Sequence, residues 1–158
     1  MIERLKEGDG LRLKKIRLKA LKSDPDAFGT TLEKVLNFSV DVWNEQTITL
    51  PTFIAVHEDR DVGMVRVGVD GEDPSVCWLI SLWVSSEVRG SGISVALIQA
   101  LLKECESRGI EKVKLDVGDD NRAAIKLYEK MGFIRNGLTG YLPAPRTHIT
   151  EFQMERKL

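Results

Sequence analysis

The apolar run "VCWLISLWV" at residues 76–84 constrains the fold of this chain more than any other segment. Apolar residues occupy both alternating sets of positions, so a strand formed here is apolar on both faces. Such a strand belongs at the centre of a sheet, with other elements covering each side. Two further strand-like runs, 53–57 and 62–69, precede it, and only the turn-forming segments "EDRD" and "DGEDPS" separate the three. Links this short predict an antiparallel meander.

The pattern changes after residue 84. Residues 91–108 and 121–131 have helical spacing, whereas 112–117 and the segments around 133–138 and 148–157 have strand character. A helix that links two strands over this distance makes a right-handed crossover and leaves the strands parallel. The sequence therefore predicts an α/β fold of the α+β kind. Its central sheet is mixed and mostly antiparallel, with one parallel β-α-β crossover and helices on both faces.

A helix is also predicted near the N-terminus. Leu13, Ile16, Ala20 and Leu21 recur at helical intervals, and a Ser-Asp-Pro stretch ends the pattern. The other face carries the cations Arg12, Lys14, Lys15, Arg17, Lys19 and Lys22. A stripe that binds polyanions is one interpretation, but a solvated helix face is commoner, and we favour the latter. Residues 30–46 predict a second, irregular helical stretch.

Composition excludes several classes of function. A chain of 158 residues fits one domain, 1–158, and a net charge of -1 offers no global field for nucleic acid or an anionic membrane. The start of the chain is charged where a signal peptide is apolar, and no apolar run approaches the ~20 residues of a spanning helix. We therefore expect a cytoplasmic location. Cys77 and Cys105 stand alone beside two histidines, so we expect core cysteines and no metal site.

The segment Arg89-Gly90-Ser91-Gly92 lies between the apolar strand and the next helix. Glycines before a helix let the backbone close around an anion, which the unpaired N–H groups of the first turn then bind. Arg89 adds a guanidinium suited to phosphate oxygens. A plain glycine-rich turn with a solvated arginine explains the glycines equally well. The segment does not match a P-loop, because no Lys-Ser/Thr pair follows its last glycine. It does not match a dinucleotide-binding fingerprint either, because Val95 stands where that motif has its third glycine.

A second motif, "NRAAIKLYEKMGF" at 121–133, has a capping residue at its start, an apolar face and a glycine at its end. Together with "WVSSEVRGSGISVALIQALL", it resembles the GCN5-related N-acetyltransferase family, over roughly residues 76–133. The resemblance implies one N-acetyltransferase domain with acetyl-CoA as cosubstrate and no metal. It also implies that the acetyl group moves to a primary amine of a small molecule or peptide, by direct attack in a ternary complex.

The resemblance also assigns binding residues. The family's pyrophosphate loop, Gln/Arg-x-x-Gly-x-Gly/Ala, here reads Arg89, Gly90, Ser91, Gly92, Ile93 and Ser94. Ser94 departs from the pattern, although its side chain is small enough to leave the backbone amides accessible. The backbone near Leu82 and Val84 is expected to bind the pantetheine arm where this strand and 112–117 separate. An unpaired N–H there would also polarise the thioester carbonyl.

Two side chains of the second motif match family positions. Asn121 matches an asparagine that contacts the cofactor, and a plain helix cap explains it equally well. Tyr128 matches the tyrosine that protonates the departing thiolate. A phenol with a pKa of ~10 is neutral at working pH and can give up that proton. We favour this role over that of a core tyrosine, because a buried phenol needs a polar partner in either case.

The general base and the acceptor are not fixed by the sequence. Some family members use a glutamate as the general base, and Trp78 stands at that position here. Asp116, His148 and Glu151 are other candidates for the base, and we do not choose among them. The acceptor groove is expected from 24–43 and 139–152. A non-catalytic acyl-CoA-binding regulatory module is the alternative function. The final run, 148–158, is a candidate sheet edge for a homodimer.

Overall fold

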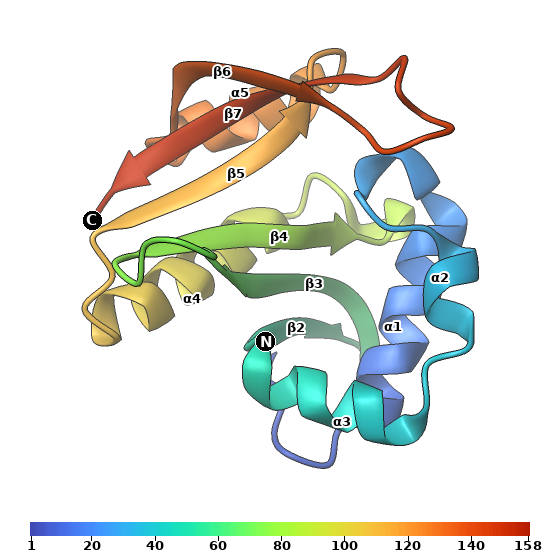
Figure 1. Cartoon of the computed structure of the whole chain (residues 1–158). Helices are drawn as coiled ribbons and strands as arrows, with labels where there is room; N and C mark the ends of the chain where they lie inside the picture. The colour runs from blue at the N-terminus through green and yellow to red at the C-terminus, as the bar shows by residue number, and fades with distance from the viewer.

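The computed structural model describes residues 1–158. Its seven strands form one sheet in the order β1-β2-β3-β4-β5-β7-β6 (Figure 1). The strands are β1 (Ile2–Arg4), β2 (Thr52–His57), β3 (Arg60–Val69), β4 (Val76–Val84), β5 (Lys112–Gly118), β6 (Ile134–Tyr141) and β7 (Thr150–Lys157). The helices are α1 (Gly10–Ser23), α2 (Leu32–Leu36), α3 (Val40–Thr49), α4 (Ile93–Ser107) and α5 (Arg122–Lys130), with short 3₁₀ turns η1 (Pro25–Ala27) and η2 (Ser86–Val88). The predicted fold class is confirmed.

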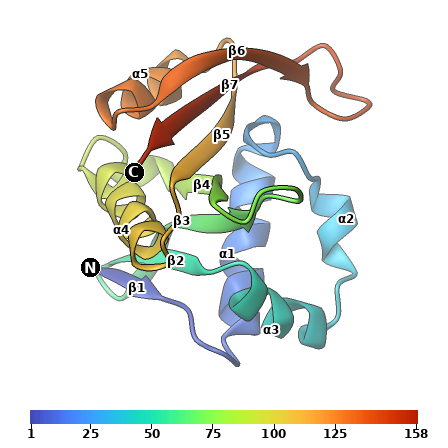
Figure 2. The same ribbon diagram turned by 60° about the vertical axis from the view of Figure 1, so that its left-hand side comes forward.

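The sheet separates two helical layers. Helices α1, α2 and α3 lie on one side, and α4 and α5 lie on the other (Figure 2). Each layer has its own apolar core: Leu13, Ile16 and Trp43 pack on the first side, whereas Leu97, Ile98 and the α5 residues pack on the second. Both cysteines are buried and free, as expected. No helix combines the length and apolar character needed to cross a membrane.

Strand β4 occupies the centre of the sheet, as its apolar character predicts. It pairs with β3 in antiparallel fashion over most of its length. Its parallel pairing with β5 covers only Val76, Cys77 and Trp78, opposite residues 112–114. Beyond Trp78 the two strands diverge, and Figure 1 shows the opening widening toward the end of β4. The second half of β4 therefore has one free edge.

A bulge interrupts β4 on its other edge. Met64 pairs with Trp83 and Arg66 pairs with Ile80, so Val65 faces both Ser81 and Leu82. Ser81 has a φ of 57°, which is the left-handed region that side-chain-bearing residues seldom adopt. Bulges of this kind re-aim side chains, and this one lies at the point where β4 and β5 have separated.

One expectation about the ends of the sheet is wrong, and one edge strand was not predicted. The final run was expected at an edge, but β7 lies between β5 and β6, and β6 forms that edge. The chain returns through the long loop after β6 and inserts its last strand beside β5. Strand β1, at the other edge, is only three residues long and carries no periodic signal that could have predicted it.

The expectation for the first helices needs two changes. Residues 30–46 form two helices rather than one, because Ser39 caps α3 by accepting a hydrogen bond from the Val42 N–H. Arg17 was assigned to the solvated face of α1, but it is 4% exposed. The 3.6-residue repeat places Arg17 beside Ile16 and Ala20 at the margin of the buried stripe, where helix packing covers it.

Packing between α1 and α3 predicts a steric effect at Gly10. A Cβ at this position would lie 2.6 Å from the backbone N of Asn44, which cannot rotate away. We expect Gly10→Ala to lower the free energy of unfolding by about 1–3 kcal/mol in urea denaturation. Gly71→Ala is the control, because a Cβ there meets nothing within 4 Å. Equal stability of the two variants would contradict the α1–α3 packing described here.

Candidate functional site

A cavity of about 940 Å³ fills the opening between β4 and β5. Its lining includes almost all of the residues that the sequence singled out: Leu82, Val84, Arg89, Gly90, Gly92, Ile93, Ser94, Asn121 and Tyr128. Ser91 is the exception, because its side chain turns back to donate a hydrogen bond to the Val88 carbonyl. The two motifs therefore meet on one cavity, although strand β5 lies between them in the sequence.

The turn before α4 is built to present backbone amides. Gly90 and Gly92 have φ values of 80° and 84°, in the left-handed region that favours glycine. No side chain caps the first turn of α4, whose N-cap residue is Gly92. The amides at the N-terminus of a 15-residue helix are thus available to a ligand. These amides, together with the positive end of the helix dipole, are suited to a phosphate group.

The structure uses the guanidinium of Arg89 in a way that the sequence did not suggest. Its Nε donates to the Val84 carbonyl at 2.9 Å, and its Nη2 pairs with Asp24 at 2.9 Å. Arg89 therefore ties the turn before α4 to the end of β4 and to the segment after α1. The backbone amides are therefore the main groups of this loop that can donate hydrogen bonds to an anion.

Asp24 is a residue that sequence reasoning missed. Its Oδ2 also accepts hydrogen bonds from Trp83 Nε1 at 2.8 Å and from Ser23 Oγ at 2.8 Å. Burial acts to raise the pKa of Asp24, but these hydrogen bonds and the charge of Arg89 outweigh it and lower the pKa. Because the carboxylate stays charged, it holds α1, β4 and the glycine turn in one arrangement. A single aspartate in a Ser-Asp-Pro turn gives no sequence signal for such a role.

Asn121 caps α5, as one of its two interpretations predicted. Its Oδ1 accepts a hydrogen bond from the Ala124 N–H at 3.3 Å. The residue also lines the cavity, so its Nδ2 group is placed to reach a ligand there. Both interpretations are therefore compatible with the structure. The role in cofactor contact stays a prediction.

Tyr128 of α5 lines the cavity. The ring is 7% exposed and packs edge-on against Phe133, with the ring centroids 5.9 Å apart. Burial raises the pKa of its phenol, so the hydroxyl carries its proton at any physiological pH. A protonated phenol in an apolar wall can donate to charge that appears beside it.

Two carboxylates, Asp116 and Glu151, line the same cavity as Tyr128. Desolvation raises the pKa of Asp116. Desolvation and the neighbouring Asp116 charge also raise the pKa of Glu151. The third candidate base, His148, is exposed in the loop between β6 and β7 and does not line the cavity. Of the three candidates for the general base, only Asp116 and Glu151 line the cavity, and they are neighbours.

The two segments expected to form the acceptor side lie against each other. Arg146, in the loop between β6 and β7, donates to the carbonyls of Pro25 and Phe28, each at 2.8 Å, and to that of Gly29 at 3.2 Å. These bonds join the loop to the segment that follows α1. The Arg146 clasp, as we call these hydrogen bonds, therefore joins residues more than 110 positions apart in the sequence.

Comparison with known proteins gives a consistent result. Residues 20–133 match the acetyltransferase (GNAT) family. The chain is 32% identical to N-alpha-acetyltransferase 30 of Schizosaccharomyces pombe over 103 residues, which is 64% of this chain and 65% of that protein. It is 30% identical to mycothiol acetyltransferase of Thermobispora bispora over 124 residues, which is 76% of this chain and 41% of that protein. The chain thus spans less than two thirds of the length of these relatives.

Solved structures share the fold over nearly the whole chain. An acetyltransferase of the GNAT family from Streptococcus pneumoniae matches with a TM-score of 0.84 and 17% identity, covering 100% of this chain and 98% of that one. A ribosomal-protein-alanine N-acetyltransferase from Brucella melitensis matches with a TM-score of 0.78 and 23% identity, covering 100% and 99%. Identities this low establish the fold alone.

The glycine turn yields a direct test of ligand binding. We expect acetyl-CoA to raise the melting temperature of the wild-type protein, because a ligand that binds only the native state stabilises it. Gly92→Val and Gly90→Glu should abolish that rise, the first by straining the left-handed turn and the second by placing a negative charge in it.

Gly137→Val is the matched control for this prediction. Gly137 has a φ of 87° and open space around it, as Gly92 does, but it does not line the cavity. This variant should lose a similar amount of intrinsic stability and keep the ligand-induced rise. A rise in melting temperature that survives in both Gly92→Val and Gly90→Glu, or a larger rise with ATP or NAD, would refute the assignment of the glycine turn to acetyl-CoA.

Proposed function

Because the chain belongs to the acetyltransferase (GNAT) family, we propose that it transfers an acetyl group from acetyl-CoA to the primary amine of a small molecule or peptide. The attack is direct, within a ternary complex. One observation carries the proposal: a single cavity has uncapped helix amides at one end and a buried phenol with two carboxylates at the other. The first group suits a phosphate, and the second suits proton transfer.

The binding part of the proposal rests on the turn and on the free edge of β4. The amides of Gly90, Gly92, Ile93 and Ser94 would hold the pyrophosphate. The backbone near Leu82 and Val84, which no longer pairs with β5, would hold the pantetheine arm. When bound, acetyl-CoA supplies an acyl group activated as a thioester. The Arg89–Asp24 pair fixes the turn, so little reorganisation is needed on binding.

The proton-transfer part of the proposal assigns opposite roles to the phenol and the acidic pair. An amine acceptor is protonated in water and must lose a proton before it attacks. Asp116, with Glu151 beside it, would attract the ammonium form and accept that proton, directly or through water. Tyr128 would donate its hydroxyl proton to the departing thiolate. Tyr128 is buried and Glu151 is partly buried, which strengthens the interactions of these two groups.

A non-catalytic acyl-CoA-binding module was the alternative. It drew its support from the absence of a carboxylate on β4, where Trp78 stands and donates to Asp70. The acidic pair on β5 and β7 supplies carboxylates from the opposite side of the opening. No specific observation now favours the alternative. Thiol release from acetyl-CoA across a panel of amines tests the two functions, since a binding module releases no thiol above the uncatalysed rate.

Tyr128→Phe should lower kcat by about 10²-fold and leave the affinity for acetyl-CoA nearly unchanged. The hydroxyl acts on charge that develops only as the thiolate departs, and Phe keeps the packing against Phe133. Glu129→Gln, at an exposed residue on the same helix but outside the cavity, should retain full kcat. Unchanged turnover in the Tyr128 variant, measured where chemistry limits the rate, would remove the acid role.

Asp116→Asn should lower kcat/KM by about 10²-fold and change the pH profile. A base must be deprotonated to act, so kcat/KM falls as the pH drops through its raised pKa. Removing the Asp116 charge also lowers the pKa of Glu151, so any residual activity should have its acid limb at lower pH. Glu106→Gln, an exposed carboxylate on α4, is the control. An unchanged profile in Asp116→Asn would exclude Asp116 as the base.

A homodimer stays part of the proposal, with its surface moved to the observed edge strand. Ile134, Leu138 and Tyr141 of β6 are 66%, 58% and 70% exposed. Edge strands with exposed apolar side chains are suited to pairing with another chain. The β6 edge is therefore where a second copy would pair.

A further inference from the structure

Two buried arginines have no acidic partner. Arg17 of α1 is 4% exposed and Arg66 of β3 is 3% exposed, yet neither takes part in any of the ion pairs of the structure. Arg17 Nη1 donates to Ser81 Oγ at 2.9 Å, and Arg66 Nη2 donates to Gln46 Oε1 at 2.8 Å. The Nε–H of each residue is buried and has no hydrogen-bond partner. Each guanidinium has five N–H donors, so most of this capacity is unused.

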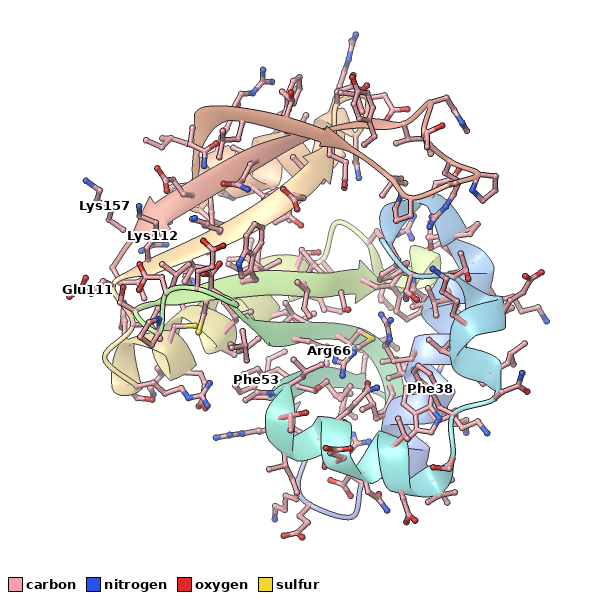
Figure 3. The ribbon with its side chains drawn as sticks, in the orientation of Figure 1. Phe38, Phe53, Arg66, Glu111, Lys112 and Lys157 are labelled. Atoms are coloured by element: carbon pink, nitrogen blue, oxygen red, sulfur yellow. The ribbon has the colours of Figure 1, made fainter.

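The two guanidinium groups lie in the same region of the core. Figure 3 shows Arg66 on the side of β3 that faces the layer of α1, α2 and α3. Its pKa is lowered to about 9, first by burial and then by the nearby charge of Arg17. Burial alone lowers the pKa of Arg17 to about 10. Neither value is raised by a carboxylate, so the protein places two like charges together and supplies no counter-charge.

Such an arrangement is costly unless an anion completes it. Buried charges in proteins are paired, because removing an ion from water costs more than uncharged hydrogen bonds return. The ring of Phe28, 5.3 Å from the Arg17 guanidinium carbon, offsets part of this cost. The Phe28 ring contacts only Arg17, so the charge of Arg66 has no such compensation. By contrast Arg12, on the same helix, is fully paired with Asp61 and Glu3.

Neither arginine lines the cavity, but the two residues that contact Arg17 adjoin residues that do. Ser81, the partner of Arg17, is the left-handed residue of the β4 bulge, and its neighbour Leu82 lines the cavity. Phe28 follows Ala27, which also lines the cavity, and its carbonyl is held by Arg146. The contacts of Arg17 therefore reach residues next to two lining positions, Leu82 of β4 and Ala27 of the segment after α1.

We propose that Arg17 and Arg66 bind the carboxylate of a small acceptor that carries an amine at its other end. This rests on the proposed acetyl transfer, which places the amine at Asp116 and Glu151. The acceptor is then held by charge of opposite sign at each end: the acidic pair binds the ammonium and the arginine pair binds the carboxylate. The Arg146 clasp and the burial of both guanidiniums favour a short, unbranched molecule over a peptide.

A direct test uses the wild-type protein and the two unpartnered Nε–H groups. Glycine, β-alanine, 4-aminobutanoate and 5-aminopentanoate are each titrated beside the matching carboxamide, and the arginine Nε–H resonances are followed by NMR. We expect the resonances of Arg17 and Arg66 to shift with at least one acid and not with its carboxamide. Resonances that stay fixed with all four acids would overturn the proposal, whether or not the protein transfers acetyl groups.

The same panel in the acetyl-transfer assay separates this proposal from the general one. The best acid should have a kcat/KM at least ~100-fold above that of its carboxamide, because the carboxamide leaves the arginines unpaired. Equal kcat/KM values would overturn the arginine site and leave the acetyltransferase proposal intact. Shifted Nε–H resonances without turnover on any amine would support the arginine site and overturn the acetyltransferase proposal.

Thermal stability supplies a further readout that a structural role would not reproduce. Arg66→Met removes an unpaired buried charge, so the ligand-free variant should melt at a higher temperature than the wild type and gain nothing from the best acid. Arg12→Met is the matched control, and it should melt at a lower temperature because it leaves Asp61 and Glu3 without their partner. An Arg66→Met variant that melts as low as Arg12→Met would contradict the proposal.

Discussion

The short pairing between β4 and β5 is the constraint on which the rest of the structure depends. Three residue pairs join the two strands, and beyond Trp78 each strand continues with a different neighbour. Separation leaves backbone N–H and C=O groups of β4 without strand partners and opens a cavity in the middle of an otherwise continuous sheet. Unpaired backbone groups at the centre of a sheet are unfavourable unless a ligand satisfies them. The fold thus provides a binding site in place of hydrogen bonds between strands.

Charge is distributed around this opening in a consistent pattern. Amides and a helix dipole offer positive potential at the glycine turn, and the Asp24–Arg89 pair fixes that turn without using up its amides. Asp116 and Glu151 supply negative charge on the lining of the same cavity, and Tyr128 supplies a neutral donor there. In the core between the sheet and α1, the Arg17–Arg66 pair offers positive charge again. Each of these groups suits one part of a reaction between a phosphate-bearing thioester and a small zwitterion.

The fold was largely predictable from the sequence, because periodicity and turn residues carry most of its information. The apolar run at 76–84 predicted a central strand, and the two motifs predicted α4 and α5 to within two residues at either end. Nine of the ten predicted site residues line the cavity, and Ser91 is the exception, whereas Asp24 lines the cavity and was not predicted. What could not be predicted depends on packing between distant segments. No local signal reveals that Arg17 is buried, that Asp24 holds three elements together, or that β7 inserts between β5 and β6.

The central claim is that backbone amides at the start of α4 hold the pyrophosphate of acetyl-CoA. Amide chemical shifts measured during titration with CoA test it most directly. The account predicts that the largest changes occur at Gly90, Gly92, Ile93 and Ser94, and that weaker ones follow β4 through Val84 and Leu82. Desulfo-CoA should reproduce the pattern, since it keeps the pyrophosphate. Changes confined to other segments, with the amides of the glycine turn unmoved at saturation, would contradict the account.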